Sequence, residues 1–460
     1  MNKLKTIMGS LMITSIISMS TTLAEPIPIR GVVEGFYGTP WTQENRIDMI
    51  NFCNSHGLNA YIYAPKDDPY HRAKWREPYP SDKLNELAKL IKSANDNNVK
   101  FIFAVSPGLD LNYSSAADLE AMIQKLTTIY NLGVRDFAIF FDDIEAKDAL
   151  GQTAFLNLLE ESFVKQHDDI SPLITVPTEY FRLDMINDDK VKTYTKDFSM
   201  TLDPDIMVLY TGEGVVQPEI NEEQFKAVTD IYGRELGIWW NYPVTDYMES
   251  KLALGPVEKL PQHSKIPAIF FNPMKYEQLS KIALATGADY AKDPEHYNAT
   301  NSWNKAIDEQ FGSLSKEMKL FADHSQHMEN TWAKVGPEDG QKLREAMDKL
   351  LSNNNFNKSL QVVKNQLKYL QSAVKNLQTD LPKNVLEECK PQLEQFERII
   401  NADFTALDLL KSRRDKNITK TQQLEDKLQN ELNEIKKHEE NAKISDKTCR
   451  AFIDEVLNEQ

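Results

Sequence analysis

Short apolar runs alternate with longer amphipathic segments between residues 28 and 290. We count eight of each, and the runs predict strands at residues 30–36, 60–63, 101–105, 137–141, 173–176, 206–210, 236–240 and 268–271. A run as continuously apolar as residues 137–141 (FAIFF) is typical of a parallel strand that helices cover on both faces. Eight repeats predict an α/β fold, the (β/α)8 or TIM barrel, although an open doubly wound sheet would show a similar alternation.

The last third of the chain has a different pattern. Beyond about residue 301 glycine becomes scarce, and Glu, Lys, Gln, Asn and Leu dominate. Apolar residues there recur at helical spacing, in one set at Leu360, Val363, Leu367 and Leu370 and in a narrower seam at Leu424, Leu428, Leu432 and Ile435. We therefore expect an all-α helical bundle domain at residues 301–460, after a catalytic barrel at residues 25–300. The bundle is expected to support the barrel, and its narrow seam leaves a homodimer open.

The first 24 residues have the pattern of an export signal. Two lysines precede an apolar run at residues 7–19, and small residues suited to cleavage lie at residues 22–24 (TLA). The run is shorter and more polar than the roughly 20 apolar residues that cross a bilayer. We expect a signal peptide at residues 1–24, a secreted or periplasmic protein, and no membrane span. A buried N-terminal helix is the alternative, and the two prolines that follow disfavour it.

Charge and cysteine content narrow the class of protein. The formal net charge is −16 at pH 7, and a surface this negative repels polyanions, so no nucleic-acid partner is expected and hyaluronan is disfavoured as a substrate. Three cysteines without CxxC spacing indicate neither a disulfide scaffold nor a metal site, and no cofactor is expected. Cys53 falls on an apolar helix face and is expected in the core. Cys389 and Cys449 could form a disulfide or remain two buried thiols.

Polar clusters follow seven of the eight predicted strands. They lie at residues 34–38, 64–68, 142–145, 177–180, 211–212, 240–241 and 272–273. In a (β/α)8 barrel the reactive residues gather at the carboxyl ends of the strands. Seven clusters at the same end are hard to explain as helix caps alone, so the sequence predicts an active site there.

Asp142 and Asp143 are the strongest catalytic candidates. Five apolar residues lead directly to this pair, and burying two carboxylates is costly unless they serve a cavity. Neighbouring strand residues face opposite ways, so both can reach one site only if the strand ends or bulges there. Two close carboxylates do not both ionise easily, which would leave a proton donor beside a negative group, as glycosidic cleavage requires. A solvated helix N-cap is the structural alternative.

Seven blocks of sequence resemble the motifs of glycoside hydrolase family 84. They are residues 30–41 (RGVVEGFYGTPW), 63–70 (YAPKDDPY), 140–145 (FFDDIE), 177–180 (PTEY), 210–212 (YTG), 239–246 (WWNYPVTD) and 271–273 (FNP). The blocks occur in the family's order and cover residues 28 to 290. The family contains β-N-acetylglucosaminidases, including enzymes that act on protein O-linked N-acetylglucosamine, and some members are named hyaluronidases.

The resemblance implies a retaining glycosidase in which the substrate supplies its own nucleophile. The substrate would be a β-linked N-acetylglucosamine on a glycan or glycoprotein. Its acetamido oxygen would attack the anomeric carbon and form an oxazoline. Asp142 would accept a hydrogen bond from the acetamido N–H, and Asp143 would protonate the leaving oxygen and then deprotonate water.

The resemblance also implies the substrate contacts. Sugar hydroxyls would be held by Gly35, Lys66, Asp246 and Asn272; Asn241 and Tyr180 would orient the acetamide and the reacting centre; Tyr37, Thr211, Val215 and Trp239 would form the pocket for its methyl group. Each residue alone has an ordinary alternative: Lys66 could be a surface lysine and Trp239 a core aromatic.

Two rival functions remain open from the sequence. A chitinase-like hydrolase would use Asp143 and Glu145, because Asp-x-Glu ends that family's strand-four motif, but Ala138 and Phe141 occupy the places of its two earlier aspartates. A non-catalytic carbohydrate-binding protein with a silent barrel is the second rival, which the intact Asp142–Asp143 pair disfavours.

Overall fold

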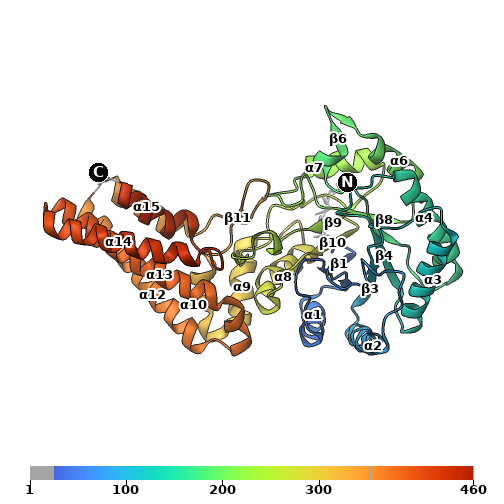
Figure 1. Cartoon of the computed structure of the whole chain (residues 1–460), viewed down its shortest axis with the longest axis horizontal. Coiled ribbons are helices and arrows are strands. Elements are labelled where there is room, and N and C mark those ends of the chain that lie inside the picture. Colours follow the sequence, from blue (N-terminus) through green and yellow to red (C-terminus); the bar gives the residue numbers. More distant parts are fainter. Residues whose placement is uncertain (1–24, 353–354, 459–460) are drawn as a thin grey trace, which may run out of the picture.

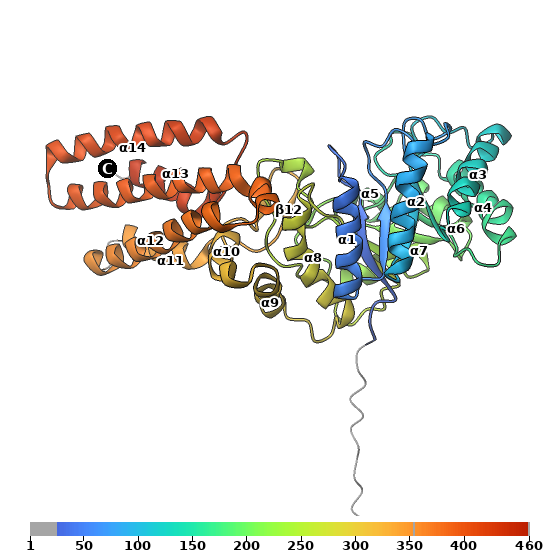
Figure 2. The same ribbon diagram turned by 90° about the horizontal axis from the view of Figure 1, so that it is seen from below.

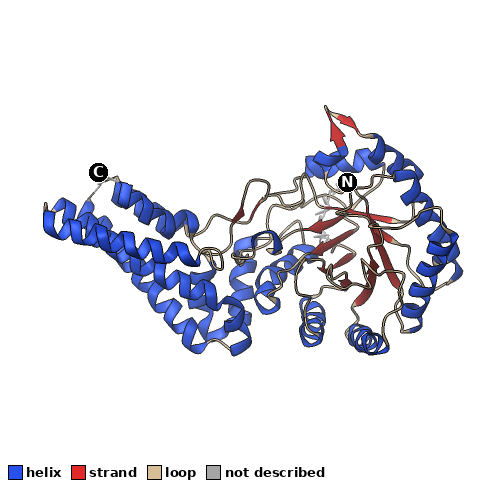
Figure 3. Ribbon diagram, in the orientation of Figure 1, coloured by secondary structure: helices blue, strands red, loops and turns tan. Residues whose placement is uncertain are grey.

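Eight parallel strands form a closed barrel in the computed structural model, which describes residues 25–352 and 355–458. The strands are β1 (Ile29–Glu34), β2 (Ala60–Tyr63), β3 (Lys100–Val105), β4 (Asp136–Phe140), β5 (Ile174–Val176), β8 (Met207–Tyr210), β9 (Gly237–Trp240) and β10 (Ala268–Phe271). They follow one another around the barrel in the order β1-β10-β9-β8-β5-β4-β3-β2. Figure 3 shows the barrel strands in red, with helices in blue around them. The predicted TIM barrel is confirmed, with each strand within two residues of its expected bounds.

Seven longer helices surround the barrel. They are α1 (Gln43–His56), α2 (Ser81–Asp96), α3 (Ala116–Asn131), α4 (Ala149–Ser162), α6 (Thr193–Thr201), α7 (Glu222–Tyr232) and α8 (Glu277–Lys292). Short elements fill two connections: η1 (Val164–Gln166) lies before β5, and α5 (Arg182–Met185) with the hairpin β6 (Ile186–Asn187)–β7 (Lys190–Val191) lies after it. Local sequence sets several ends, as at α1, where the Thr42 side chain caps the first turn and Gly57 ends the helix in the left-handed conformation.

The expectation of eight amphipathic helices is wrong at one connection. Between β9 and β10 the chain is irregular and contains only the 3₁₀ turn η2 (Asp246–Met248). Pro256 and Pro261 interrupt this segment, and proline lacks the N–H that a continuous helix needs. Apolar residues of this segment, such as Leu252 and Leu254, are nevertheless fully buried.

A mostly helical region lies to one side of the barrel (Figures 1 and 2). Its elements are α9 (Ala299–Phe311), η3 (Gly312–Leu314), α10 (Ser315–Ala322), the hairpin β11 (Met328–Glu329)–β12 (Lys334–Val335), α11 (Gln341–Leu351), α12 (Phe356–Asp380), α13 (Lys383–Arg414), α14 (Ile418–His438), the π-helical turn η4 (Asp446–Arg450) and α15 (Ala451–Asn458). The apolar positions expected to pack are buried or half-buried. The expected boundary between residues 25–300 and 301–460 falls within α9, which begins at residue 299. The division into these two domains stays a prediction.

The helical region is docked on the last barrel helix. The Glu388 carboxylate of α13 accepts hydrogen bonds from the backbone N–H groups of Gln278 and Leu279, at 3.0 and 2.8 Å. These N–H groups belong to the first turn of α8, where a helix lacks internal partners for its donors. The contact supports the expectation that the helices brace the barrel.

The three cysteines are buried free thiols, and Cys53 lies in the core as predicted. Cys449 lies against Asp403, which stands fourteen residues beyond Cys389 on α13. Fourteen residues of α-helix span about 21 Å, far beyond the reach of a disulfide. Of the two alternatives, the structure therefore has two separate buried thiols.

The predicted signal peptide at residues 1–24 lies outside the described residues. Among the residues that are described, no helix has both the length and the apolar character needed to cross a membrane.

Candidate active site

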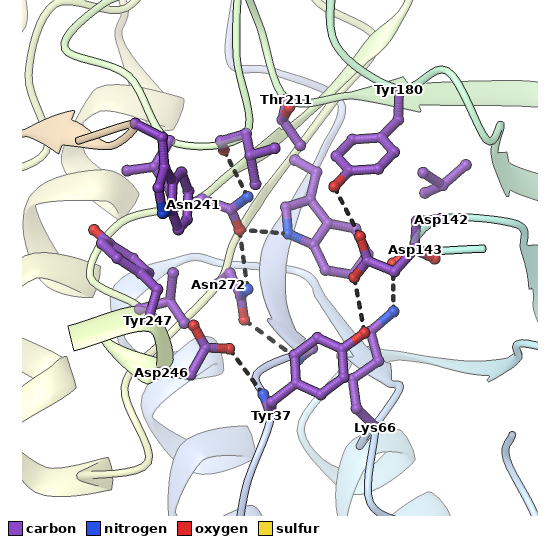
Figure 4. A pocket seen from close by; sticks show the side chains of 17 residues that line it. Tyr37, Lys66, Asp142, Asp143, Tyr180, Thr211, Asn241, Asp246, Tyr247 and Asn272 are labelled. Carbon is purple, nitrogen blue, oxygen red and sulfur yellow. Dashed lines mark hydrogen bonds and ion pairs between the residues drawn. The ribbon is translucent and has the colours of Figure 1, made fainter. Parts of the chain in front are cut away.

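A cavity of about 520 Å³ opens at the carboxyl ends of the barrel strands (Figure 4). All twelve residues singled out from the sequence line it: Gly35, Tyr37, Lys66, Asp142, Asp143, Tyr180, Thr211, Val215, Trp239, Asn241, Asp246 and Asn272. They come from the carboxyl ends of seven different strands and the loops that follow them, with Trp239 on β9 itself. Val176, Val216, Val244, Tyr247 and Trp332 complete the lining.

Asp142 and Asp143 both reach this cavity because β4 ends just before them. The strand ends at Phe140, and Asp143 has a φ of +54°, in the left-handed region. This turn breaks the alternation of a strand, so two consecutive side chains serve one side. The expectation that the strand ends here is confirmed, and the turn conformation is one that residues other than glycine adopt at some energetic cost.

The Asp142 carboxylate is buried and ion-paired. Its Oδ2 accepts a hydrogen bond from the Lys66 ammonium, which is also buried. Its Oδ1 has no hydrogen-bond partner. Because a buried acceptor without a donor costs about 1–3 kcal/mol, Asp142 is suited to accept an N–H from a ligand.

Two phenols hold the Asp143 carboxylate. Tyr180 donates to Oδ1 and Tyr37 donates to Oδ2, both at 2.8 Å (Figure 4). Burial, together with the negative charge of Asp143, raises the pKa of both tyrosines well above the ordinary value. Both phenols therefore remain protonated donors at neutral pH. Asp143 itself is the more exposed acid of the pair.

Trp239 and two asparagines form one wall of the cavity. Asn241 Oδ1 accepts hydrogen bonds from Trp239 Nε1 at 2.9 Å and from Asn272 Nδ2 at 3.0 Å, while Asn241 Nδ2 donates to the Val215 carbonyl at 2.8 Å. Only glycine fits at position 35, because a Cβ there would lie 2.3 Å from Trp239 Cζ2. These bonds fix the indole and both amides before any ligand binds.

Asp246 supplies a third carboxylate, away from the acid pair. It accepts the Tyr37 backbone N–H at 2.8 Å, and burial raises its pKa. Thr211 donates to the Gly214 carbonyl at 2.8 Å, so its methyl group is the part left to face a ligand. The cavity combines apolar walls with a few fixed polar groups, which is the composition of small-ligand sites.

Other acids of the strand-end clusters are structural. Glu34 accepts two hydrogen bonds from Arg46 at 2.8 Å and one from Tyr61. Glu179 is bound by Thr195 and Lys147, and Asp68 by Tyr63 and Tyr79. Glu145 is exposed and does not line the cavity. The chitinase-like alternative, which needs Glu145 as its acid, therefore lacks the required geometry.

Tyr247 and Trp332 line the cavity but were not expected from the sequence. Tyr247 directly follows a recognised motif and could have been found by extending it. Trp332 lies on the β11–β12 hairpin, far along the chain from the barrel, and its ring centroid lies 5.2 Å from that of Tyr247. No local pattern marks it, because its position depends on how the helical region docks. Among the described residues no cluster of three or more His, Cys, Asp or Glu side chains could hold a metal ion.

Two family models match the chain. The β-N-acetylglucosaminidase model matches residues 30–323, and a model described as hyaluronidase post-catalytic domain-like matches residues 341–453. The first covers the barrel and all the cavity residues except Trp332, which lies between the two matches.

Characterised relatives and solved structures give the same picture. Protein O-GlcNAcase of Mus musculus and of Rattus norvegicus are each 31% identical over 302 residues, which is 63% of this chain and 32% of theirs. The chain thus spans about a third of the length of these relatives. The structure of CpGH84B has a TM-score of 0.89 at 38% identity, over 94% of this chain and 77% of that one. A mutant of the Thermobaculum terrenum O-GlcNAc hydrolase has a TM-score of 0.84 at 29% identity, over 93% and 94%.

Proposed function

The chain belongs to the β-N-acetylglucosaminidase family, glycoside hydrolase family 84, and from this premise we propose that it removes β-linked N-acetylglucosamine from glycans or glycoproteins. The observation that carries the proposal is the acid pair. Asp142 and Asp143 line one cavity, one paired with a lysine and keeping a free acceptor, the other held by two phenols. This division suits one acid that stays charged and one that exchanges a proton.

In the first step the acetamido oxygen of the sugar attacks the anomeric carbon. Asp142 Oδ1 accepts a hydrogen bond from the acetamido N–H. This bond makes the acetamido oxygen more nucleophilic and stabilises the positive charge that develops. The bond from the anomeric carbon to the leaving oxygen breaks as Asp143 donates a proton to that oxygen. The products are the free alcohol of the aglycone and a bound, protonated oxazoline (oxazolinium ion), whose N–H stays hydrogen-bonded to the Asp142 carboxylate.

In the second step water opens the oxazoline. Asp143, now a carboxylate, takes a proton from the water, and the water oxygen bonds to the anomeric carbon. The ring C–O bond breaks and restores the acetamide. Two displacements at the same carbon leave the product with the β configuration of the substrate.

The remaining cavity residues are suited to recognise the sugar. Asp246, Asn272, Lys66 and Gly35 would bind hydroxyl groups, Asn241 and Tyr180 would orient the acetamide, and Tyr37, Thr211, Val215 and Trp239 would enclose its methyl group. The fixed amides and the indole support this assignment, because preorganised groups lose little freedom when the ligand binds.

Export to the periplasm or medium is a further part of the proposal, supported by the sequence of residues 1–24. The narrow apolar seam of α14 does not support pairing of two copies, because Leu428, Leu432 and Ile435 are buried within the single chain. Cell fractionation tests the location of the protein, and light scattering after size-exclusion chromatography tests its oligomeric state.

Hydrolysis of 4-nitrophenyl N-acetyl-β-glucosaminide by the wild type and by Asp143→Asn tests the function. We expect nitrophenol release by the wild type, a β-anomer as the first sugar product by NMR, and a large loss in the variant. Glu145→Gln is the matched control, because Glu145 lies outside the cavity, and it should retain activity. No release by the wild type would favour a carbohydrate-binding protein, and a dead Glu145→Gln beside an active Asp143→Asn would favour the chitinase-like mechanism.

A further inference from the structure

Arg72 contacts Tyr37 and Asp143 but does not line the cavity. It follows β2 in the loop that also carries Lys66. Its guanidinium donates from Nη1 to the Tyr37 hydroxyl at 2.8 Å and from Nη2 to the main-chain carbonyl of Asp143 at 3.2 Å. The guanidinium carbon also lies 5.5 Å from the centre of the Tyr37 ring. Arg72 thus touches Asp143 and a side chain that binds Asp143.

Hydrogen-bond accounting shows what the first contact does. Arginine only donates, so the Tyr37 oxygen must act as the acceptor from Arg72. A phenol has a single proton, which is then directed to Asp143 Oδ2 at 2.8 Å. With the arginine absent, the Tyr37 hydroxyl would be free to rotate toward water or a ligand. Arg72 therefore fixes the direction of a hydrogen bond that ends on the catalytic acid.

The second contact acts on the backbone. Asp143 has a φ of +54°, a conformation that costs a residue other than glycine of order 1 kcal/mol or more. Its carbonyl accepts the Arg72 Nη2 donor, which stabilises that turn. A planar guanidinium with donors in a fixed fork can make both contacts at once, and a lysine ammonium lacks this shape.

We propose that Arg72 is a positioning residue that aims the Asp143 carboxyl at the leaving oxygen, through the Tyr37 phenol and through the Asp143 main chain. The inference rests on the proposed function of Asp143 as the acid. Arg72 does not line the cavity, so we expect it to act on the sugar and the leaving group only through Tyr37 and Asp143. Its loss should weaken proton donation more than sugar binding.

Leaving-group dependence separates this role from a merely structural one. The kcat/KM value reports steps up to the first irreversible one, here loss of the aglycone. A 2,4-dinitrophenolate leaves without help from an acid, whereas 4-methylumbelliferone and simple alcohols need a proton. A variant with a badly aimed acid therefore loses activity on poor leaving groups and keeps it on the dinitrophenyl substrate.

The experiment compares kcat/KM of wild type, Arg72→Gln, Arg72→Lys and Arg76→Gln on dinitrophenyl and methylumbelliferyl N-acetyl-β-glucosaminides. We expect Arg72→Gln to lose about tenfold or more on the methylumbelliferyl substrate, as part of the roughly 10²–10⁴-fold worth of a general acid, and at most a few-fold on the dinitrophenyl one. Arg72→Lys should fall between wild type and Arg72→Gln. Arg76 is the matched control, since it binds Asp110 and Asp118 in the same part of the chain, and its variant should show no leaving-group dependence.

A double-mutant cycle keeps the test decisive if the Arg72 variants are less stable. Tyr37→Phe removes the hydrogen bond from the Tyr37 hydroxyl to Asp143. Arg72→Gln should therefore reduce acid catalysis less in that background than in the wild type. Equal losses on both substrates, full activity of Arg72→Gln, full recovery with Arg72→Lys, or additive effects in the cycle would each overturn the proposal. A wild type inactive on the dinitrophenyl substrate would instead refute the proposed function.

Discussion

The mouth of the barrel and the helical region both bury an aspartate whose hydrogen bonding is incomplete. At the barrel mouth Asp142 has one oxygen without a partner, but the other is paired with Lys66, and the side chain lines a cavity. In the helical region Asp403 on α13 is fully buried, neither carboxyl oxygen has a well-formed hydrogen bond, and the Cys449 thiol lies beside it.

The two acids differ in what compensates for burial. Asp142 has a buried cation against it, and a ligand N–H can complete its bonding. For Asp403, burial raises the pKa well above the ordinary value of 3.8, which favours the neutral form of the carboxyl group. An unpartnered buried oxygen therefore indicates a ligand site only where a counter-charge and a cavity accompany it. Elsewhere it lowers the stability of the fold.

The largest expected effect is on activity at the barrel mouth. Asp142→Asn and Asp143→Asn should each lower kcat by about 10²–10⁴-fold, because each removes an interaction made in the transition state. Only Asp142→Asn should also lower the melting temperature, since it leaves the buried Lys66 cation without its counter-charge. Steady-state kinetics with calorimetry checks both. A destabilised Asp143→Asn with a fully stable Asp142→Asn would contradict this reading of the pair.

Asp403→Asn is expected to act on stability alone and with the opposite sign. Burial raises the pKa of the folded acid above that of the unfolded one, so its contribution to stability falls as pH rises above about 4. The variant does not titrate, so its stability relative to the wild type should rise over that interval, by at most about 1.4 kcal/mol per pH unit. Thermal unfolding at pH 4, 5.5 and 7 measures the gap, with the exposed Asp408→Asn on the same helix as control. If the difference in unfolding free energy between Asp403→Asn and the wild type did not change with pH, the proposed difference between Asp403 and Asp142 would be wrong.

Glu388, where the helical region meets the barrel, should give a smaller pH-dependent change in stability. Burial raises its pKa to about 7, against hydrogen bonds from the Gln278 and Leu279 N–H groups that favour the charged form. Its contribution is full below pH 4.5 and is lost as pH rises through 7. Glu388→Gln keeps an acceptor and removes the titration, so its stability should change less between pH 5 and 8 than that of the wild type. Glu387→Gln, at an exposed neighbouring position, is the control, and identical pH curves for both variants would contradict the assignment.

Trp332→Ala should have the smallest effect and tests how the helical side completes the barrel mouth. The indole is 56% exposed and packs on Tyr247 at the cavity, so it is placed to contact the group attached to the sugar. We expect KM to rise about threefold to tenfold for glycopeptides, as suits an aromatic contact of about 0.5–1.5 kcal/mol, with little change for methyl N-acetyl-β-glucosaminide. Tyr369→Ala, an exposed aromatic on α12, is the matched control. Equal changes on both substrates would exclude a contact with the aglycone.

The sequence predicted the features that depend on short stretches of chain. Continuous apolar runs located all eight strands, and the Asp142–Asp143 pair after one of them located the cavity. Features that depend on tertiary contacts were missed. Trp332 enters the cavity through docking of the helical region, Arg72 acts through side chains far from it in sequence, and Asp403 looks like any polar residue of an amphipathic helix. The segment before β10 has buried leucines but no α-helix, because buried leucines alone do not specify a helix.

The most direct test of the central claim changes the nucleophile that the substrate carries. Successive fluorination of the N-acetyl group, from acetyl to trifluoroacetyl, weakens its carbonyl oxygen as a nucleophile while leaving the leaving group unchanged. If that oxygen attacks the anomeric carbon beside Asp142, wild-type kcat/KM falls steeply and steadily across the series. A value that stays flat across the series would contradict the account, because the nucleophile would then be a group of the protein or water.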